Sequence, residues 1–145
     1  MSDYSPYNWR NNIDATNQTR MNAIEQGIAN TPGMYFVAPY TLINNTTIND
    51  GVTQTVTCTG VGGVPSGAKG AVLHGIWYPY TAAMRFMIAP HGSLASNYPQ
   101  QIATITFPNY QSFFMIIPLD GGGQIDVKPT GGNIVIYLYM IGYTH

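Results

Sequence analysis

Apolar and polar residues alternate in short runs over most of the chain, and glycine, proline or asparagine separates the runs. The clearest run, residues 71–76, follows the stretch 60–67, whose glycines and proline permit a sharp turn. Similar runs predict further strands at 34–37, 40–43, 52–59, 83–89, 102–107, 113–118, 124–127 and 134–141. Short strands at this spacing indicate a mainly β fold, an antiparallel β-sandwich or jelly roll.

A helical pattern replaces this alternation at 14–27. Asp14 can cap the helix and Gly27 can end it. A seam with spacings of three and four runs through Asn17, Met21, Ile24 and Ile28. A helix this short is marginal alone, so it must pack against the β domain or against copies of itself. Because asparagine in a seam can fix register and oligomer number, the seam predicts a homotrimer.

The first nine residues contain three aromatic side chains and no periodicity, which is typical of an extended arm. Tyr4, Tyr7 and Trp9 are expected to dock on the protein's own domain or on a neighbouring subunit. Proline and glycine at 32–33 end the helix. The predicted organisation is therefore an arm and short helix at 1–32, for attachment and oligomerisation, and a β-sandwich domain at 33–145.

Charge is scarce, because only 8% of the 145 residues are charged against about 25% in an average soluble protein. Hydroxyl, amide and tyrosine groups must provide most of the wetted surface, which suits a protein packed in an assembly. A net charge of -1 argues against a nucleic-acid partner. The longest apolar run near the C-terminus, 134–142, is too short to cross a membrane as a helix.

Residues with catalytic chemistry are dispersed, so we expect no enzyme, no catalytic residue and no cofactor. Asp120 and Asp126 flank a glycine turn, where an aspartate ordinarily bonds its own backbone. Cys58 has no cysteine partner, and the three histidines lack ligand spacing. We therefore predict no metal site; copies of one histidine meeting on a trimer axis are the alternative.

Aromatic residues beside prolines and amides are the best candidates for recognition. A ring can cover the apolar surface of a sugar or protein while its polar edge finds partners. The candidate surface residues are Trp77, Tyr78, Tyr80, His91, Asn97 and Tyr98. Ordinary packing at the rim of a sandwich is the competing interpretation.

Residues 9–28 resemble a short segment of bacteriophage tail-fibre and other virion proteins. That segment has a tryptophan, an alanine, an asparagine-rich helix start and a closing pattern of hydrophobic-Asn-x-Ile-Glu-x-Gly-Ile. The matching residues here are Trp9, Ala15, Asn17, Met21, Asn22, Ile24, Glu25, Gly27 and Ile28, with Met21 where leucine is usual. The resemblance implies a virion component whose helix joins a distal domain to a symmetric mount.

The remainder of the chain, roughly 52–143, resembles a β-sandwich module of actinobacterial surface proteins and phage structural proteins. The similar stretches are 63–72, 96–97, 117–127 and 141–143, with Gly70 where alanine is expected. The resemblance transfers no catalytic residue.

Together these patterns predict a non-enzymatic bacteriophage virion protein, a trimeric exterior fibre or knob. Its expected partners are its own copies, other virion proteins of capsid or tail, and a host surface glycan or protein. Its expected location is the virion, after synthesis in the host cytoplasm. One alternative is a capsid decoration protein. An alternative of another class is a carbohydrate-binding module of a surface protein.

Overall fold

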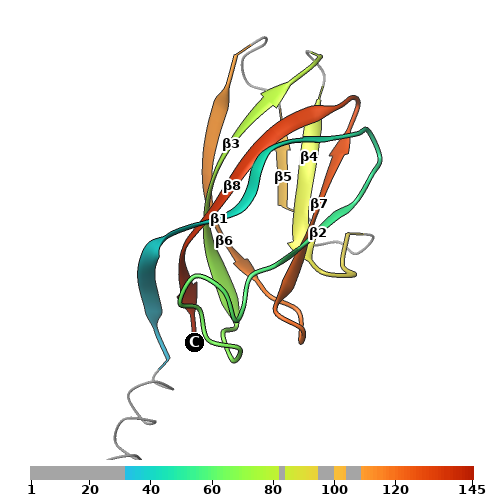
Figure 1. The fold of residues 1–145 in the computed structure, drawn as a ribbon. Helices are drawn as coiled ribbons and strands as arrows, with labels where there is room; N and C mark the ends of the chain where they lie inside the picture. The colour runs from blue at the N-terminus through green and yellow to red at the C-terminus, as the bar shows by residue number, and fades with distance from the viewer. Residues whose placement is uncertain (1–31, 82–83, 95–99, 104–108) are drawn as a thin grey trace, which may run out of the picture. The chain divides into compact units, whose positions relative to one another are not determined.

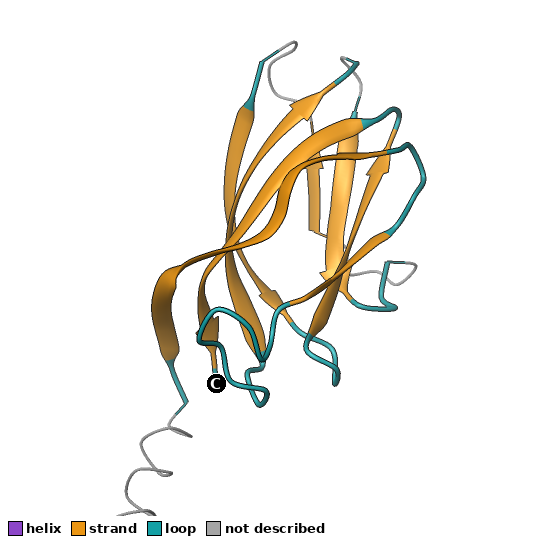
Figure 2. Cartoon of the chain, in the orientation of Figure 1, coloured by secondary structure: helices purple, strands orange, loops and turns teal. Residues whose placement is uncertain are grey.

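The computed structural model of the chain describes residues 32–81, 84–94, 100–103 and 109–145. These residues form eight strands and contain no helix (Figures 1 and 2). The strands are β1 (Met34–Ile48), β2 (Gln54–Thr57), β3 (Gly70–Pro79), β4 (Arg85–Pro90), β5 (Gln100–Ala103), β6 (Gln111–Pro118), β7 (Gln124–Thr130) and β8 (Ile134–Thr144). No helix of the described residues is long and apolar enough to cross a membrane.

Two antiparallel sheets of four strands face one another, in the orders β1-β8-β3-β6 and β2-β7-β4-β5 (Figure 1). The predicted mainly β, antiparallel sandwich is confirmed. Successive strands alternate between the sheets except at the β4–β5 hairpin, which is the strand order of a jelly roll. The predicted arm, helix and trimer seam lie in residues 1–31, outside the described residues, so they and the domain division stay predictions.

β1 differs from its prediction, because the expected strands at 34–37 and 40–43 are one long strand. Its pairing with β8 shifts register between Phe36 and Tyr40 and twice more before Thr46. Pro39 cannot donate to a ladder, and Asn45 has a positive φ of 44°. These interruptions bend the strand without ending it, and they hid its continuity in the sequence pattern.

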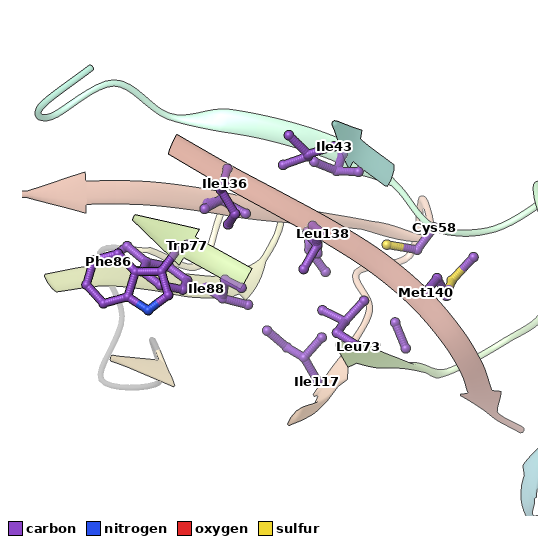
Figure 3. Packing of buried hydrophobic residues seen from close by; sticks show 14 of the residues in the cluster. Ile43, Cys58, Leu73, Trp77, Phe86, Ile88, Ile117, Ile136, Leu138 and Met140 are labelled. Atoms are coloured by element: carbon purple, nitrogen blue, oxygen red, sulfur yellow. The ribbon is translucent and has the colours of Figure 1, made fainter. Parts of the chain in front are cut away.

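The core lies between the sheets and follows the two-residue period of the strands. On β8, alternate residues from Ile134 to Met140 are fully buried, and on the other sheet Phe86 and Ile88 of β4 are fully buried too. Figure 3 shows these side chains meeting between the sheets. Burial of such side chains is the main stabilisation of the sandwich, at about 1.5–3 kcal/mol for each large one.

Each end of the sandwich is a separate group of loops. The described residues of the β3–β4 end are 49–53, 80–81, 84 and 131–133. They are joined by hydrogen bonds such as Thr81 Oγ1 to Gly131 O at 3.1 Å and Gly131 N to Asp50 Oδ1 at 3.0 Å. The β6–β7 end comprises loops 58–69, 91–94 and 119–123. There, Lys69 N donates to Thr144 O at 2.8 Å. The two ends hold different candidate residues.

Candidate functional site

Three tyrosines form a cluster at the β3–β4 end of the sandwich. Tyr78 lies near the end of β3 and Tyr110 immediately precedes β6, so the antiparallel β3–β6 pairing brings them together. Their ring centroids are 5.1 Å apart, and those of Tyr78 and Tyr80 are 5.9 Å apart with perpendicular planes. Tyr80 is 51% exposed and Tyr110 61%. We refer to Tyr78, Tyr80 and Tyr110 as the tyrosine cluster.

Hydrogen bonds hold the backbone that carries Tyr80. Its N–H lies 3.3 Å from Asn133 O and 3.2 Å from the Met84 sulfur. The Thr81 N–H also donates to that sulfur, at 3.3 Å. Met84 is buried in the core. These hydrogen bonds hold the backbone of Tyr80 and Thr81 against the core and the β7–β8 turn. The Tyr80 ring is therefore positioned before a ligand binds.

Each ring of the tyrosine cluster has an apolar face and a hydroxyl group at its edge. The four strands of its sheet, β1, β3, β6 and β8, contain no Asp, Glu, Lys or Arg. The other sheet, by contrast, carries Arg85, Asp126 and Lys128. The cluster therefore lies on a sheet without formal charge, and can offer a ligand stacking, van der Waals contact and neutral hydrogen bonds.

Trp77 is a correction to the expected surface set. Its side chain is fully buried, with its ring centroid 4.9 Å from that of Phe86 in an edge-on contact. The two-residue period of β3 places Trp77 on the same side as Leu73, toward the other sheet. Trp77 is therefore a core residue and cannot contact a surface ligand.

The structure brings together only part of the predicted set. Tyr78 and Tyr80 are neighbours, as a surface site requires. Asn97 and Tyr98 lie outside the described residues. Tyr110 was missed, because only the β3–β6 register places it beside Tyr78. The available signal was an aromatic residue three positions before the strand predicted at 113–118.

His91 lies at the opposite, β6–β7 end and has structural partners there. Its Nδ1 is 2.9 Å from Oδ1 of Asp126, an aspartate that is only 4% exposed. Thr55 Oγ1 donates to the same Oδ1 at 2.7 Å, and Gly92 N donates to Oδ2 at 2.9 Å. This carboxylate therefore joins β7 to β2 and to the turn after β4.

The contacts of this pair move both pKa values. The hydrogen bond to Asp126, reinforced by its charge, raises the pKa of His91. Burial by itself raises the pKa of Asp126, but the hydrogen bonds from His91, Thr55 and Gly92 outweigh it and hold that pKa below its ordinary value. Both shifts favour the charged pair. The geometry thus gives His91 a role in holding the β6–β7 end together.

The other polar candidates also have local partners. Asp120 accepts a hydrogen bond from Gln124 N at 2.5 Å, as expected for an aspartate in a turn. Cys58 is buried, and burial, with a smaller contribution from the charge of Asp120, raises its pKa to about 12. Within the described residues, no three His, Cys, Asp or Glu side chains are grouped to hold a metal ion.

Comparison with known proteins finds no matching family model and no matching curated protein. Among solved structures, the chain is similar to a carbohydrate-binding module, CBM6cm-2, from Cellvibrio mixtus lichenase 5A in complex with cellotriose, at 10% identity and a TM-score of 0.40, covering 75% of this chain and 95% of that one. It is also similar to the C-terminal CBM6 of LamC, a marine laminarinase from Zobellia galactanivorans, at 10% identity and a TM-score of 0.45, covering 77% and 99%.

These comparisons contradict the predicted function. Both similar structures are carbohydrate-binding modules, so the prediction of a virion fibre or knob is wrong. The segment that carried the virion resemblance, 9–28, lies outside the described residues. What remains of the two resemblances is the β-sandwich module itself.

Proposed function

We propose that the chain is a non-catalytic carbohydrate-binding domain that holds a neutral glycan against the tyrosine cluster. The observation that carries the proposal is the tyrosine cluster, in which the exposed rings of Tyr80 and Tyr110 lie 5.9 and 5.1 Å from the half-buried ring of Tyr78. A sugar ring has an apolar C–H face and a rim of hydroxyls. An exposed phenol ring matches both, because its face covers apolar surface and its hydroxyl exchanges hydrogen bonds with the rim.

The choice of a neutral glycan follows from charge. The strands of the sheet that carries Tyr78 contain no Asp, Glu, Lys or Arg, and the ring of their one histidine, His74, lies 6.3 Å from that of Tyr139. These strands therefore offer no permanent charge to pair with a sulfate, carboxylate or amine of a charged glycan. Binding through rings and hydroxyls alone is weakly dependent on ionic strength, because salt screens charges and leaves stacking unchanged.

Preorganisation supports the same conclusion. The Tyr80 N–H is held by Asn133 O and the Met84 sulfur, so little ordering of the Tyr80 backbone opposes binding. Tyrosine also has few rotatable bonds, and fixing its ring costs little side-chain entropy. A site built this way can bind a flexible, hydrated ligand with modest affinity.

The non-catalytic part of the proposal rests on the acidic residues. The three that the structure describes, Asp50, Asp120 and Asp126, each accept a hydrogen bond from a backbone N–H in a turn. None of them lies in the tyrosine cluster. Asp120 and Asp126 lie at the opposite end of the sandwich, which leaves Asp50 as the one described carboxylate at the end that carries the cluster. A glycan there would not meet the pair of described carboxylates that glycoside hydrolysis ordinarily uses.

The test is binding of the full chain to a panel of neutral and acidic glycans, followed by calorimetry on any that bind. Tyr80→Ala and Tyr110→Ala should each weaken binding about ten-fold, equal to ~1.4 kcal/mol. Phe36→Ala is the matched control, because Phe36 is 70% exposed on β1, near the other end of the sheet, and should leave affinity unchanged. Affinity should hold between about 0.05 and 0.5 M salt. Failure of every glycan at millimolar concentration would reject the proposal, as would wild-type affinity in both tyrosine variants.

A further inference from the structure

Within the part of the chain that the structure describes, residues 112–118 of the outer strand β6 have a neighbouring strand on one side and none on the other. β6 ends the order β1-β8-β3-β6, and within the described residues it pairs with β3 alone. The pairing runs from Trp77 opposite Gln111 to Gly70 opposite Pro118 without a register shift. In an antiparallel ladder, alternate residues direct their N–H and C=O groups away from the neighbouring strand. A regular row of donors and acceptors therefore lies along β6.

The other three outer strands are protected and β6 is not. β1 contains Pro39 and three register shifts, which prevent a regular ladder on its free side. β2 and β5 are only four residues long. β6 has eight residues, no charged side chain and no bulge, with its single proline at the final position. Charge, proline, bulges and shortness are the usual protections of an edge strand, and β6 lacks them along its length.

The side chains of β6 add apolar contact to this edge. Phe113 faces the core, with its ring centroid 5.2 Å from that of Phe86. Phe114 and Ile116 point the other way and are 59% and 46% exposed. No described side chain of the strand would repel a second apolar strand.

We propose that β6 is a self-association edge, at which two copies of this chain pair antiparallel about a two-fold axis. Only an extended strand can satisfy a regular row of backbone donors and acceptors, and a second β6 presents the same row in complementary order. With the axis at Met115, Phe114 of one copy lies opposite Ile116 of the other. Aromatic and β-branched residues form favourable cross-strand pairs, and the symmetry makes this pair twice.

The dimer joins two four-stranded sheets into one sheet of eight strands. Because the axis is perpendicular to the joined sheet, both copies present the same outer face. Tyr110 precedes β6, so the dimer presents two tyrosine clusters on that face. The association does not depend on the proposed glycan site and is measured without any glycan.

The test is sedimentation velocity of the full chain between about 1 and 100 μM. The wild-type protein should reach twice its 15.8 kDa mass. Phe114→Lys and Ile116→Lys place a charge on the interface and should raise the dimer dissociation constant at least about ten-fold. Phe36→Lys is the control, because it places the same charge on an exposed aromatic position of β1 and should leave the dimer unchanged. Circular dichroism of each variant checks that the fold is retained.

Hydrogen exchange then locates the interface. Amide protection in residues 112–118 of the wild-type protein should rise with protein concentration, because pairing covers the free edge. A monomer at all concentrations would overturn the proposal. A dimer or trimer whose exchange at 112–118 does not change with concentration, or that persists in Phe114→Lys, would also overturn it and place the association elsewhere.

Discussion

Replacing Asp126 by asparagine removes one charge from the β6–β7 end and keeps the shape of the side chain. In the protein, the carboxylate accepts three hydrogen bonds, from Thr55, His91 and Gly92. The amide oxygen of asparagine can still accept from Thr55 and His91. Its NH₂ group would then oppose the Gly92 N–H, donor against donor, so one bond is lost and two are weakened.

The expected cost follows from the contacts of Thr55 and Gly92. A bond to a charged acceptor contributes about 1.5–3 kcal/mol and a neutral one about 0.5–1.5, so the Thr55 bond weakens by roughly 1 kcal/mol and the Gly92 bond is lost. Thr55 and Gly92 are exposed, and water compensates them in part. We expect Asp126→Asn to lower the free energy of unfolding by about 2 kcal/mol and Tm by roughly 8 °C. The His91 contact is not counted in this figure, because His91 is 45% exposed and solvent screens its charge.

The loss should depend on pH in a defined direction. The folded pKa of Asp126 lies below its ordinary value of 3.8, so its contribution is present above that pH and is lost as pH falls through the folded pKa. The folded pKa of His91 lies above 6.5, so its contribution is complete below that pH and is lost as pH rises through the folded pKa. The difference between wild type and Asp126→Asn should therefore be greatest between about pH 4 and 6.5.

Chemical denaturation from pH 3 to 9 measures this difference, and an NMR titration follows His91, whose pKa should return toward 6.5 in the variant. Asp50→Asn is the control, since Asp50 is exposed, accepts from Gly131 N at 3.0 Å and has no histidine bonded to it in the described structure. It should cost less than about 1 kcal/mol. A stability difference that is constant across pH, or an unchanged His91 titration, would refute the reasoning.

Two further predictions concern packing and reactivity. In Gly142→Ala the new Cβ would lie 2.5 Å from Tyr35 O on the paired strand, so unfolding free energy should fall by about 3 kcal/mol by urea titration. Gly121→Ala, whose Cβ meets nothing within 4 Å, should have no effect; equal losses in both would contradict the packing argument. Cys58, with its pKa raised from 9.0 to about 12, should react with a disulfide reagent at pH 8 roughly a thousand-fold more slowly than in denaturant, and a fast native reaction would count against its burial.

The strands were predictable where one face is buried and the chain is uninterrupted. The predicted run at 113–118 lies within β6, and the run at 134–141 lies within β8. In both strands, successive side chains point alternately into the core and away from it, which gives the sequence its two-residue hydrophobic period. β1 was divided into two because proline and asparagine are turn signals in a sequence. Whether they end a strand or bend it depends on the hydrogen bonds to β8, which only the fold supplies.

The faces of β3 were not predictable from its sequence. Both rows of the strand are largely apolar, with Leu73 and Trp77 in one and Val72 and Ile76 in the other. Either row could have faced the core, and a tryptophan beside tyrosine and proline was interpreted as exposed. The contact between Trp77 and Phe86 of the opposite sheet shows that the row with Leu73 and Trp77 faces the core. Tyr110 was missed for a related reason, since strand register is a long-range property.

The two sheets differ in charge. The strands of the sheet β1-β8-β3-β6 contain no Asp, Glu, Lys or Arg and one histidine, His74, so recognition at its outer face or its β6 edge must rest largely on shape, apolar area and hydrogen bonds. The charged pair of His91 and Asp126 lies on the other sheet and at the other end. The hydrogen bonds of that pair therefore act on the stability of the β6–β7 end. Glycan binding and self-association are best measured between about pH 4 and 6.5, where the contribution of the pair to stability is complete.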